Sequence, residues 1–274
     1  MRAHVIRIVL VLAVCGVSSQ AAKADNFAYA AATDGNLYLV DLTTSTPTLI
    51  GSMDQPQFME GLALSPGGQL FGTDDAGNLF SINPTTGAAT LIGSTGLGDV
   101  EGLKFDGVTL LGINFAATPT VFSINTVTAG ATDVVTADSP TGAVRAMTVL
   151  DPNDVLVRGD GPPNNTLYSL NLSTGFVTTI GTLAVDGSQF AAMDFVNGVL
   201  YGLDNDGSEW IINPSDAAVT LVGNTGRQFW LEMTAVTSTP EPATLPPFGL
   251  GLLCLGSRLL KRVPGRTIEL TTGT

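Results

Sequence analysis

Short apolar runs separated by turn residues recur along most of this chain. Between residues 61 and 93 four of them follow one another: Leu62–Leu64, Leu70–Gly72, Leu79–Ile82 and Thr90–Gly93. Each run is closed by Gly, Ser, Thr, Pro, Asn or Asp. Runs of this length with turn residues between them are typical of strands joined by hairpins. The pattern therefore predicts a four-stranded antiparallel meander.

The meander repeats with a period of about forty residues, which is the signature of a repeat architecture. The first run of the repeat, around Leu62, recurs at Leu103, Met147, Met193 and Met233, with successive spacings of 41, 44, 46 and 40 residues. Five copies of this first strand are therefore expected. The second, third and fourth strands also occur five times each, beginning with the runs at Phe27, Leu37 and Leu49.

The order of the runs predicts how the array closes. The repeats start with a second strand at Phe27–Ala30 and end with a first strand at Glu232–Ala235. The last strand can therefore complete the first sheet, which would close a ring and leave no free edge. We expect an all-β fold, a five-bladed β-propeller with a shared closing blade. An open or differently closed array is the alternative, because the blade number comes only from counting repeats.

The two ends of the chain differ in character from the repeats. Residues 1–24 combine Arg2 and Arg7, an apolar run from Ile8 to Val17 and the small-residue end Ala22-Lys23-Ala24. This pattern predicts a secretory signal peptide that ends at residue 24. We therefore divide the chain into a signal peptide (1–24), a propeller (25–237) and a C-terminal tail (238–274).

Charge narrows the range of partners. The whole chain of 274 residues has a formal net charge of −13, and between residues 25 and 239 only Lys104, Arg145, Arg158 and Arg227 oppose 22 acids. Nucleic acid is excluded as a partner because binding it needs clustered Lys and Arg. A cationic partner fits the sign, although acidity also keeps a secreted protein soluble.

The residues that most hydrolases need are missing from the propeller. His4 is the only histidine, and both cysteines, Cys15 and Cys254, lie in the terminal segments. No Ser-His-Asp or Cys-His arrangement and no histidine metal site can form there. We expect a non-catalytic protein without cofactor or metal. Paired carboxylates, as used by glycosidases, are the one enzymatic alternative left open.

The repeat itself resembles known propellers. GLALS, LFGTD, NLFSINPTTG and TLIG, in that order within residues 61–93, resemble the NHL and YVTN propeller repeats and bacterial propeller domains of unknown function. These motifs mark strands and turns, so the resemblance implies an architecture and no particular reaction. It also implies that the first strand of each repeat lines the central axis.

Three charged residues share one place in that first strand. Glu60, Glu101 and Arg145 stand two residues before Leu62, Leu103 and Met147. If the first strands line the axis, these side chains meet at its entrance and are the candidate ligand-binding residues. A carboxylate pair beside an arginine could bind a sugar or a cation. The alternative, which the sequence favours, is a set of loop charges that neutralise one another.

Two further patterns have a structural and a functional interpretation. Acidic turns near Asp34, Asp74 and Asp204 lie between second and third strands, and Asp204–Gly207 resembles part of a calcium loop. However, none has the full loop spacing with its closing Glu, and Asp-Gly turns are common in hairpins. Four aromatic residues precede first strands. These residues are Phe58, Phe190, Phe229 and Trp230. They would stack on sugars if exposed or pack between the blades if buried, and the sequence favours burial.

The tail carries a second resemblance. Pro240, Glu241 and Pro242 are followed by the apolar run Phe248–Gly256 and then by Arg258, Lys261 and Arg262. This order is similar to the PEP-CTERM sorting signal, which implies an exosortase-type processing enzyme as partner and transient membrane anchoring. Prolines hold a segment extended, and cations after an apolar run stay cytoplasmic. The simpler alternative is a linker followed by a plain transmembrane-type anchor.

Two classes of function remain. The first is an exported envelope or extracellular-matrix protein of a Gram-negative bacterium, whose propeller binds an exopolysaccharide or another protein. The second is a carboxylate-based enzyme that acts on glycans. A close Glu60 and Glu101 pair with raised pKa values would favour the second class.

Overall fold

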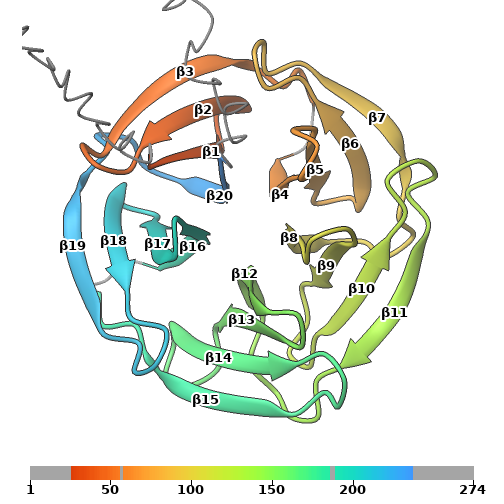
Figure 1. Cartoon of the computed structure of the whole chain (residues 1–274), viewed down its shortest axis with the longest axis vertical. Coiled ribbons are helices and arrows are strands. Elements are labelled where there is room, and N and C mark those ends of the chain that lie inside the picture. The colour runs from red at the N-terminus through yellow and green to blue at the C-terminus, as the bar shows by residue number, and fades with distance from the viewer. Residues whose placement is uncertain (1–25, 56–57, 186–188, 237–274) are drawn as a thin grey trace, which may run out of the picture. The chain divides into compact units, whose positions relative to one another are not determined.

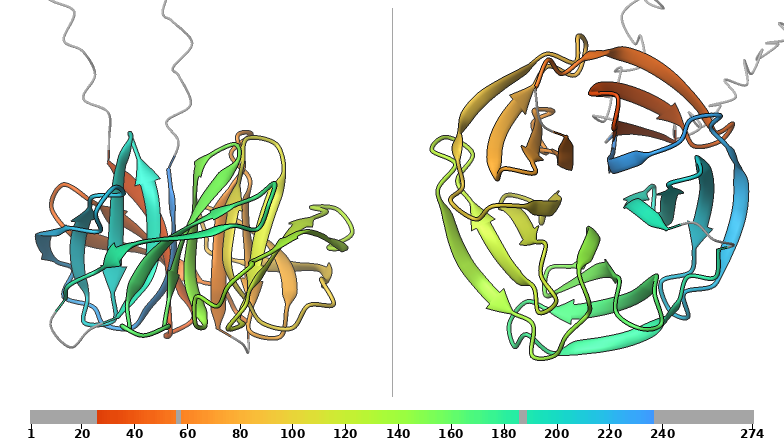
Figure 2. Two further views of the ribbon diagram at one scale, coloured as in Figure 1. Left: turned by 90° about the horizontal axis from the view of Figure 1, so that it is seen from below. Right: turned by 180° about the vertical axis from the view of Figure 1, so that it is seen from behind.

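The computed structural model describes residues 26–55, 58–185 and 189–236, and these residues form a ring of five four-stranded antiparallel sheets around one axis (Figure 1). Figure 2 shows the ring from the side and from behind. The expected signal peptide and the sorting motif at Pro240, Glu241 and Pro242 lie outside the described residues.

The strands follow the predicted runs in all five blades. Blade 1 contains β20 (Trp230–Ala235), β1 (Phe27–Ala32), β2 (Asn36–Asp41) and β3 (Thr46–Ser52). Blade 2 contains β4 (Met59–Leu64), β5 (Leu70–Asp74), β6 (Asn78–Ile82) and β7 (Ala89–Ser94). Blade 3 contains β8 (Val100–Phe105), β9 (Leu110–Asn114), β10 (Thr120–Ile124) and β11 (Ala131–Thr136). Blade 4 contains β12 (Val144–Asp151), β13 (Asp154–Gly159), β14 (Thr166–Asn171) and β15 (Val177–Thr182). Blade 5 contains β16 (Phe190–Val196), β17 (Val199–Asp204), β18 (Ser208–Ile212) and β19 (Val219–Asn224).

Blade 1 closes the ring as the order of runs predicts. The last strand, β20, pairs antiparallel with the first, so that Ala30 lies opposite Met233 and Tyr29 opposite Thr234. The backbone N–H of Val236 also donates to the carbonyl of Phe27 at 2.9 Å. The predicted five-bladed propeller with a shared closing blade is therefore confirmed. Because the first and last strands share a sheet, none of the described blades is left as a free end of the array.

The core lies between neighbouring blades, where both faces of each sheet are covered. The second residue of the third strand shows this best, because it is a fully buried aliphatic residue in four blades: Leu37, Leu79, Val121 and Leu167. The outermost strands are more polar and more exposed. In blade 5 the corresponding core position is Glu209, which is also fully buried.

Every innermost strand carries a β-bulge at its second residue. In β4, Met59 pairs with Asp74 and Gly61 with Thr73, so that Glu60 between them has no partner in the ladder. The same skip leaves one residue unpaired in each of the other four inner strands: Glu101, Arg145, Ala191 and Leu231. A bulge turns a side chain away from its regular alternation and is frequent beside functional sites. We call these five residues the bulge ring.

Candidate functional site

The bulge ring encloses a cavity at the end of the axis where the inner strands begin. All five bulge residues line it, and its volume is about 260 Å³. This volume is below the usual range for drug-sized ligands and suits one small polar group such as a sugar ring. The structure therefore brings Glu60, Glu101 and Arg145 to one place, as their shared position in the repeat predicts.

A chain of ion pairs joins the charged residues on one side of the cavity. The Nη1 atom of Arg145 lies 3.2 Å from Oε1 of Glu101, and its Nε lies 3.3 Å from Oδ2 of Asp160. The other oxygen of Asp160 lies 2.7 Å from Nη2 of Arg158. Asp160 thus connects two guanidinium groups, and Arg145 is further packed on the Phe115 ring at 4.6 Å. This order holds Arg145 and Arg158 in fixed positions at the cavity wall.

Arg158 has hydrogen-bonding capacity left over. Its side chain is fully buried, and its Nε donates to Oδ1 of Asn165 at 2.8 Å. Within the described ranges, its Nη1 atom has no hydrogen-bond partner, although Arg158 lines the cavity. Burial lowers the pKa of the Arg158 guanidinium, with the nearby Asp160 carboxylate opposing this change. A buried N–H without an acceptor is costly, so this atom is ready to bind an acceptor on a ligand.

Three carboxyl groups gather beside this arginine pair. Oxygens of Glu60, Asp99 and Glu101 lie within 4.8 Å of one another. Burial, followed by the charge of Glu60, raises the pKa of Glu101 to about 9. Burial, followed by the charge of Asp99, also raises the pKa of Glu60. The Asp99 pKa is raised by burial and by Asp75. Protons or a cationic group would relieve this crowding of acids.

One edge of the cavity is aromatic. Phe229 lines the cavity, is 57% exposed and has a positive φ of 62°, whereas Trp230 beside it is buried. Phe190 also lines the cavity and is buried, while Phe58 is exposed. The prediction that these aromatic residues are buried is thus right for Phe190 and Trp230. It is wrong for Phe58 and Phe229, because these two lie in the loops before the strands.

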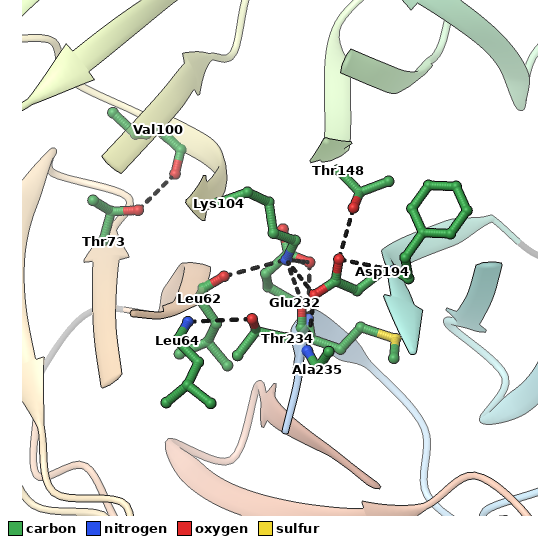
Figure 3. A network of polar contacts seen from close by, with 12 residues as sticks. Leu62, Leu64, Thr73, Val100, Lys104, Thr148, Asp194, Glu232, Thr234 and Ala235 are labelled. Carbon is green, nitrogen blue, oxygen red and sulfur yellow. Dashed lines mark hydrogen bonds and ion pairs between the residues drawn. The ribbon is translucent and has the colours of Figure 1, made fainter. Parts of the chain in front are cut away.

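The other end of the axis is closed by a buried lysine (Figure 3). The ammonium of Lys104 in β8 lies 3.3 Å from Oε1 of Glu232, 3.2 Å from the carbonyl of Leu62 and 3.9 Å from Oδ2 of Asp194. The hydroxyl of Thr148 donates to the other oxygen of Asp194 at 2.6 Å. These residues come from five different blades. We call this set the lysine network, and it ties the five inner strands together.

The lysine network contains a fully buried carboxyl group, that of Glu232. Its Oε2 atom has no hydrogen-bond partner in the part of the chain that the structure describes. Burial raises the Glu232 pKa to about 8, although the Lys104 ammonium opposes this shift. A second cavity of about 340 Å³ adjoins this end, and Lys104, Thr148 and Asp194 are among the residues that line it. The contacts of the lysine network join all five inner strands, which is a structural role.

Two of the acidic turns, at Asp204 and Asp74, use their aspartate side chains within the hairpins, whereas Asp34 is also paired with Arg227. Oδ1 of Asp204 accepts the backbone N–H groups of Asp206 and Ser208, and Oδ2 accepts the indole N–H of Trp210 at 2.8 Å. Asp74 accepts N–H groups of Ala76 and Asn78 in the same way. These bonds are those of ordinary side-chain-stabilised turns. The side-chain bonds of Asp204 are therefore those that the hairpin interpretation predicts.

Sequence reasoning missed Arg158, which lines the cavity, and two acids near it, Asp160 and Asp99. Arg158 lies in a second strand and Asp160 follows it, so neither shares the repeat position of Glu60. Asp99 precedes its strand by one residue. A sequence signal existed for the lysine network at the other end of the axis. Lys104 and Asp194 occupy the same repeat position and have opposite charges, which predicts an ion pair across the axis.

The fold defines the protein as a five-bladed β-propeller, and the comparisons agree. A chain from a crystal structure of a nidogen–laminin complex is 16% identical, with 78% of this chain and 86% of that one covered and a TM-score of 0.52. A protein of unknown function from Bacteroides caccae is 12% identical, with 78% and 100% covered and a TM-score of 0.54. A protein of unknown function from Bacteroides thetaiotaomicron is 16% identical, with 71% and 55% covered and a TM-score of 0.50.

Identities this low establish a shared fold and nothing more specific. No known protein family and no curated protein matches the sequence. Within residues 26–55, 58–185 and 189–236, no helix has the length and apolar character needed to cross a membrane. The predicted transmembrane-type tail falls outside these ranges.

Proposed function

We propose that this protein is an exported, non-catalytic binding protein of the cell envelope or extracellular matrix, and that its ligand enters the bulge-ring cavity. The observation that carries the proposal is the convergence of all five bulge residues on one cavity. Five bulges at the same position re-aim five side chains toward one point. Two of the propeller's four cations line this cavity, in a domain that is otherwise strongly acidic.

The position of the cavity also suits a binding role. β20 begins at Trp230 beside the cavity and ends at Ala235 beside the lysine network. The described chain therefore leaves the propeller at the end of the axis opposite the cavity. A tether attached through this end would leave the cavity facing away from its point of attachment.

A binding screen tests this part of the proposal. The full chain is applied to an array of bacterial polysaccharides and envelope proteins, in parallel with Arg145→Ala and Asp133→Asn. Arg145 bridges Glu101 and Asp160, whereas Asp133 is exposed on the outer strand β11. We expect a ligand whose binding is lost in Arg145→Ala and kept in Asp133→Asn. The proposal is wrong if every ligand found binds both variants equally, or if none is found.

Export and sorting are the second part of the proposal. The N-terminal pattern supports secretion, and the tail around Pro240, Glu241 and Pro242 supports processing by an exosortase-type enzyme in a Gram-negative bacterium. The test is the intact mass of the protein recovered from membrane and extracellular fractions of its host. A chain that begins at Asp25 and ends near Pro240 is expected. A membrane-bound chain that retains Thr274 would make the tail a plain anchor.

One observation favours the enzymatic alternative, a carboxylate-based enzyme acting on glycans. Glu60 and Glu101 both have raised pKa values, as a general acid needs. However, oxygens of the two carboxyl groups lie within 4.8 Å of each other and of an Asp99 oxygen, in one cluster. Glycosidase carboxyl groups instead face each other across the bond that is cleaved. Incubation of the array glycans with the protein, followed by reducing-end analysis, decides between the two. Release of new reducing ends that Glu101→Gln abolishes would establish the enzyme.

A further inference from the structure

We infer that the ligand of the bulge-ring cavity is a sugar that carries a free, positively charged amino group, as found in a polysaccharide of non-acetylated amino sugars. This inference rests on the proposed binding function and names the chemistry of its ligand. Three features of the cavity carry it: an unpartnered buried donor, an adjoining group of acids and an exposed aromatic ring.

The donor is Arg158. Its fully buried side chain lines the cavity, and its Nη1 atom has no acceptor among the described residues. Its Nε donates to Oδ1 of Asn165, and its Nη2 lies 2.7 Å from Oδ1 of Asp160 as an ion pair without hydrogen-bond geometry, so two contacts restrain the guanidinium. Hydroxyl and ring oxygens of a sugar are neutral acceptors that would satisfy it.

The acids provide the place for the amino group. Glu60 and Glu101 line the cavity, and an Asp99 oxygen lies within 4.8 Å of theirs. Among the residues that the structure describes, Arg145 is the one cation paired directly with this group of three, through Glu101. An ammonium group has three donors and one positive charge, which match this group of three acids once Glu101 has released its proton. An anionic sugar would meet the same carboxylates unfavourably, and the net charge of −13 would also repel it.

The aromatic ring and the size complete the argument. Phe229 is more than half exposed at the cavity edge, where one face of a sugar ring can cover it. The volume of about 260 Å³ has room for a single ring and little more. The cavity would therefore hold one amino sugar at the end or at a kink of a longer polymer.

The test compares two probes that differ only at the nitrogen, glucosamine tetramer and N-acetylglucosamine tetramer, by titration calorimetry at pH 7. We expect binding of the free amine and at least about tenfold weaker binding of the acetylated form, because acetylation removes the charge. Glu60→Gln and Phe229→Ala should each weaken binding of the amine severalfold, while Asp133→Asn leaves it unchanged. Circular dichroism checks that each variant is folded.

A second readout separates ligand recognition from a structural effect. Burial keeps Glu101 largely protonated at pH 7, since its pKa is about 9. Binding of an ammonium favours the carboxylate, so the protein should release up to about one proton per site, measured as a heat that varies with the buffer. Equal binding of both tetramers, or no binding of either, overturns this inference. If Arg145-dependent ligands then appear on the array, the proposed function stands; if none appears, it falls too.

Discussion

Glu209 occupies a core position that is aliphatic in the other four blades, and this makes its replacement a sharp test of the structure. The side chain is fully buried between blades 5 and 1, and neither carboxylate oxygen has a geometrically sound hydrogen bond in the described structure. The Ser45 side chain lowers the Glu209 pKa and the Asp41 charge raises it, while Glu209 in turn raises the pKa of Tyr201. Burial, the main cause, raises the Glu209 pKa from 4.5 to about 7.

The sign of the effect follows from proton binding. Between pH 4.5 and 7 the folded protein holds a proton on Glu209 that the unfolded chain has lost, so stability falls as the pH rises through this window. From the two pKa values, ionisation costs about 3 kcal/mol at pH 8 and about 1 kcal/mol at pH 5. Glu209→Leu removes this cost and fills the site as Leu37, Leu79 and Leu167 fill theirs.

Thermal unfolding of the wild type and Glu209→Leu at both pH values measures the difference. The variant should gain about 2 kcal/mol more at pH 8 than at pH 5, or about 4–8 °C in Tm. Glu209→Gln, which keeps the shape and loses the charge, should lose the same pH dependence. An equal gain for Glu209→Leu at both pH values would mean that burial does not raise the pKa of Glu209 in the folded protein.

Two other variants probe how the blades are held together. Lys104→Met should lower the free energy of unfolding, measured in urea, by about 3–5 kcal/mol, because it leaves the buried Glu232 carboxylate uncompensated. Adding Glu232→Gln to this variant should restore part of the lost stability. No recovery in the double variant would contradict the role of the Lys104–Glu232 pair. Gly51→Ala should destabilise by about 2–4 kcal/mol, because its Cβ would lie 2.2 Å from the Thr86 carbonyl of blade 2. Gly67→Ala, with its nearest contact at 3.8 Å, is the matched control and should change stability by no more than about 0.5 kcal/mol.

The fold could be predicted from the sequence because each blade repeats one pattern. The first-strand run around Leu62 recurs until Met233, and the repeats begin at Phe27 with a second strand. The last run therefore supplies the first strand that the first repeat lacks, which correctly placed β20 beside β1. The site was only partly predictable. Glu60, Glu101 and Arg145 share a repeat position, so counting found them. The bulge that turns them toward the axis is a feature of backbone pairing and leaves no separate mark in the residue pattern.

The remaining site residues depend on contacts between blades. Arg158 looks like an ordinary strand residue, and only the packed structure shows that it is buried with a free Nη1. Glu209 was more accessible to reasoning, since an acid in a series of Leu and Val is a visible exception. What the series does not show is whether such an acid finds a partner, because that partner would come from a loop of the neighbouring blade.

The closing blade also sets the order in which the molecule can fold. Ala30 and Met233 are opposite each other in one sheet although about 200 residues separate them, and joining such distant segments is slow because chain entropy opposes it. Until β20 has been synthesised and released, β1 keeps an open edge of unpaired backbone groups. The lysine network has the same dependence, because Glu232 and the Met233 carbonyl reach Lys104 only with that last strand. A nascent or truncated chain that stops before Trp230 would therefore hold four complete blades around an unclosed gap.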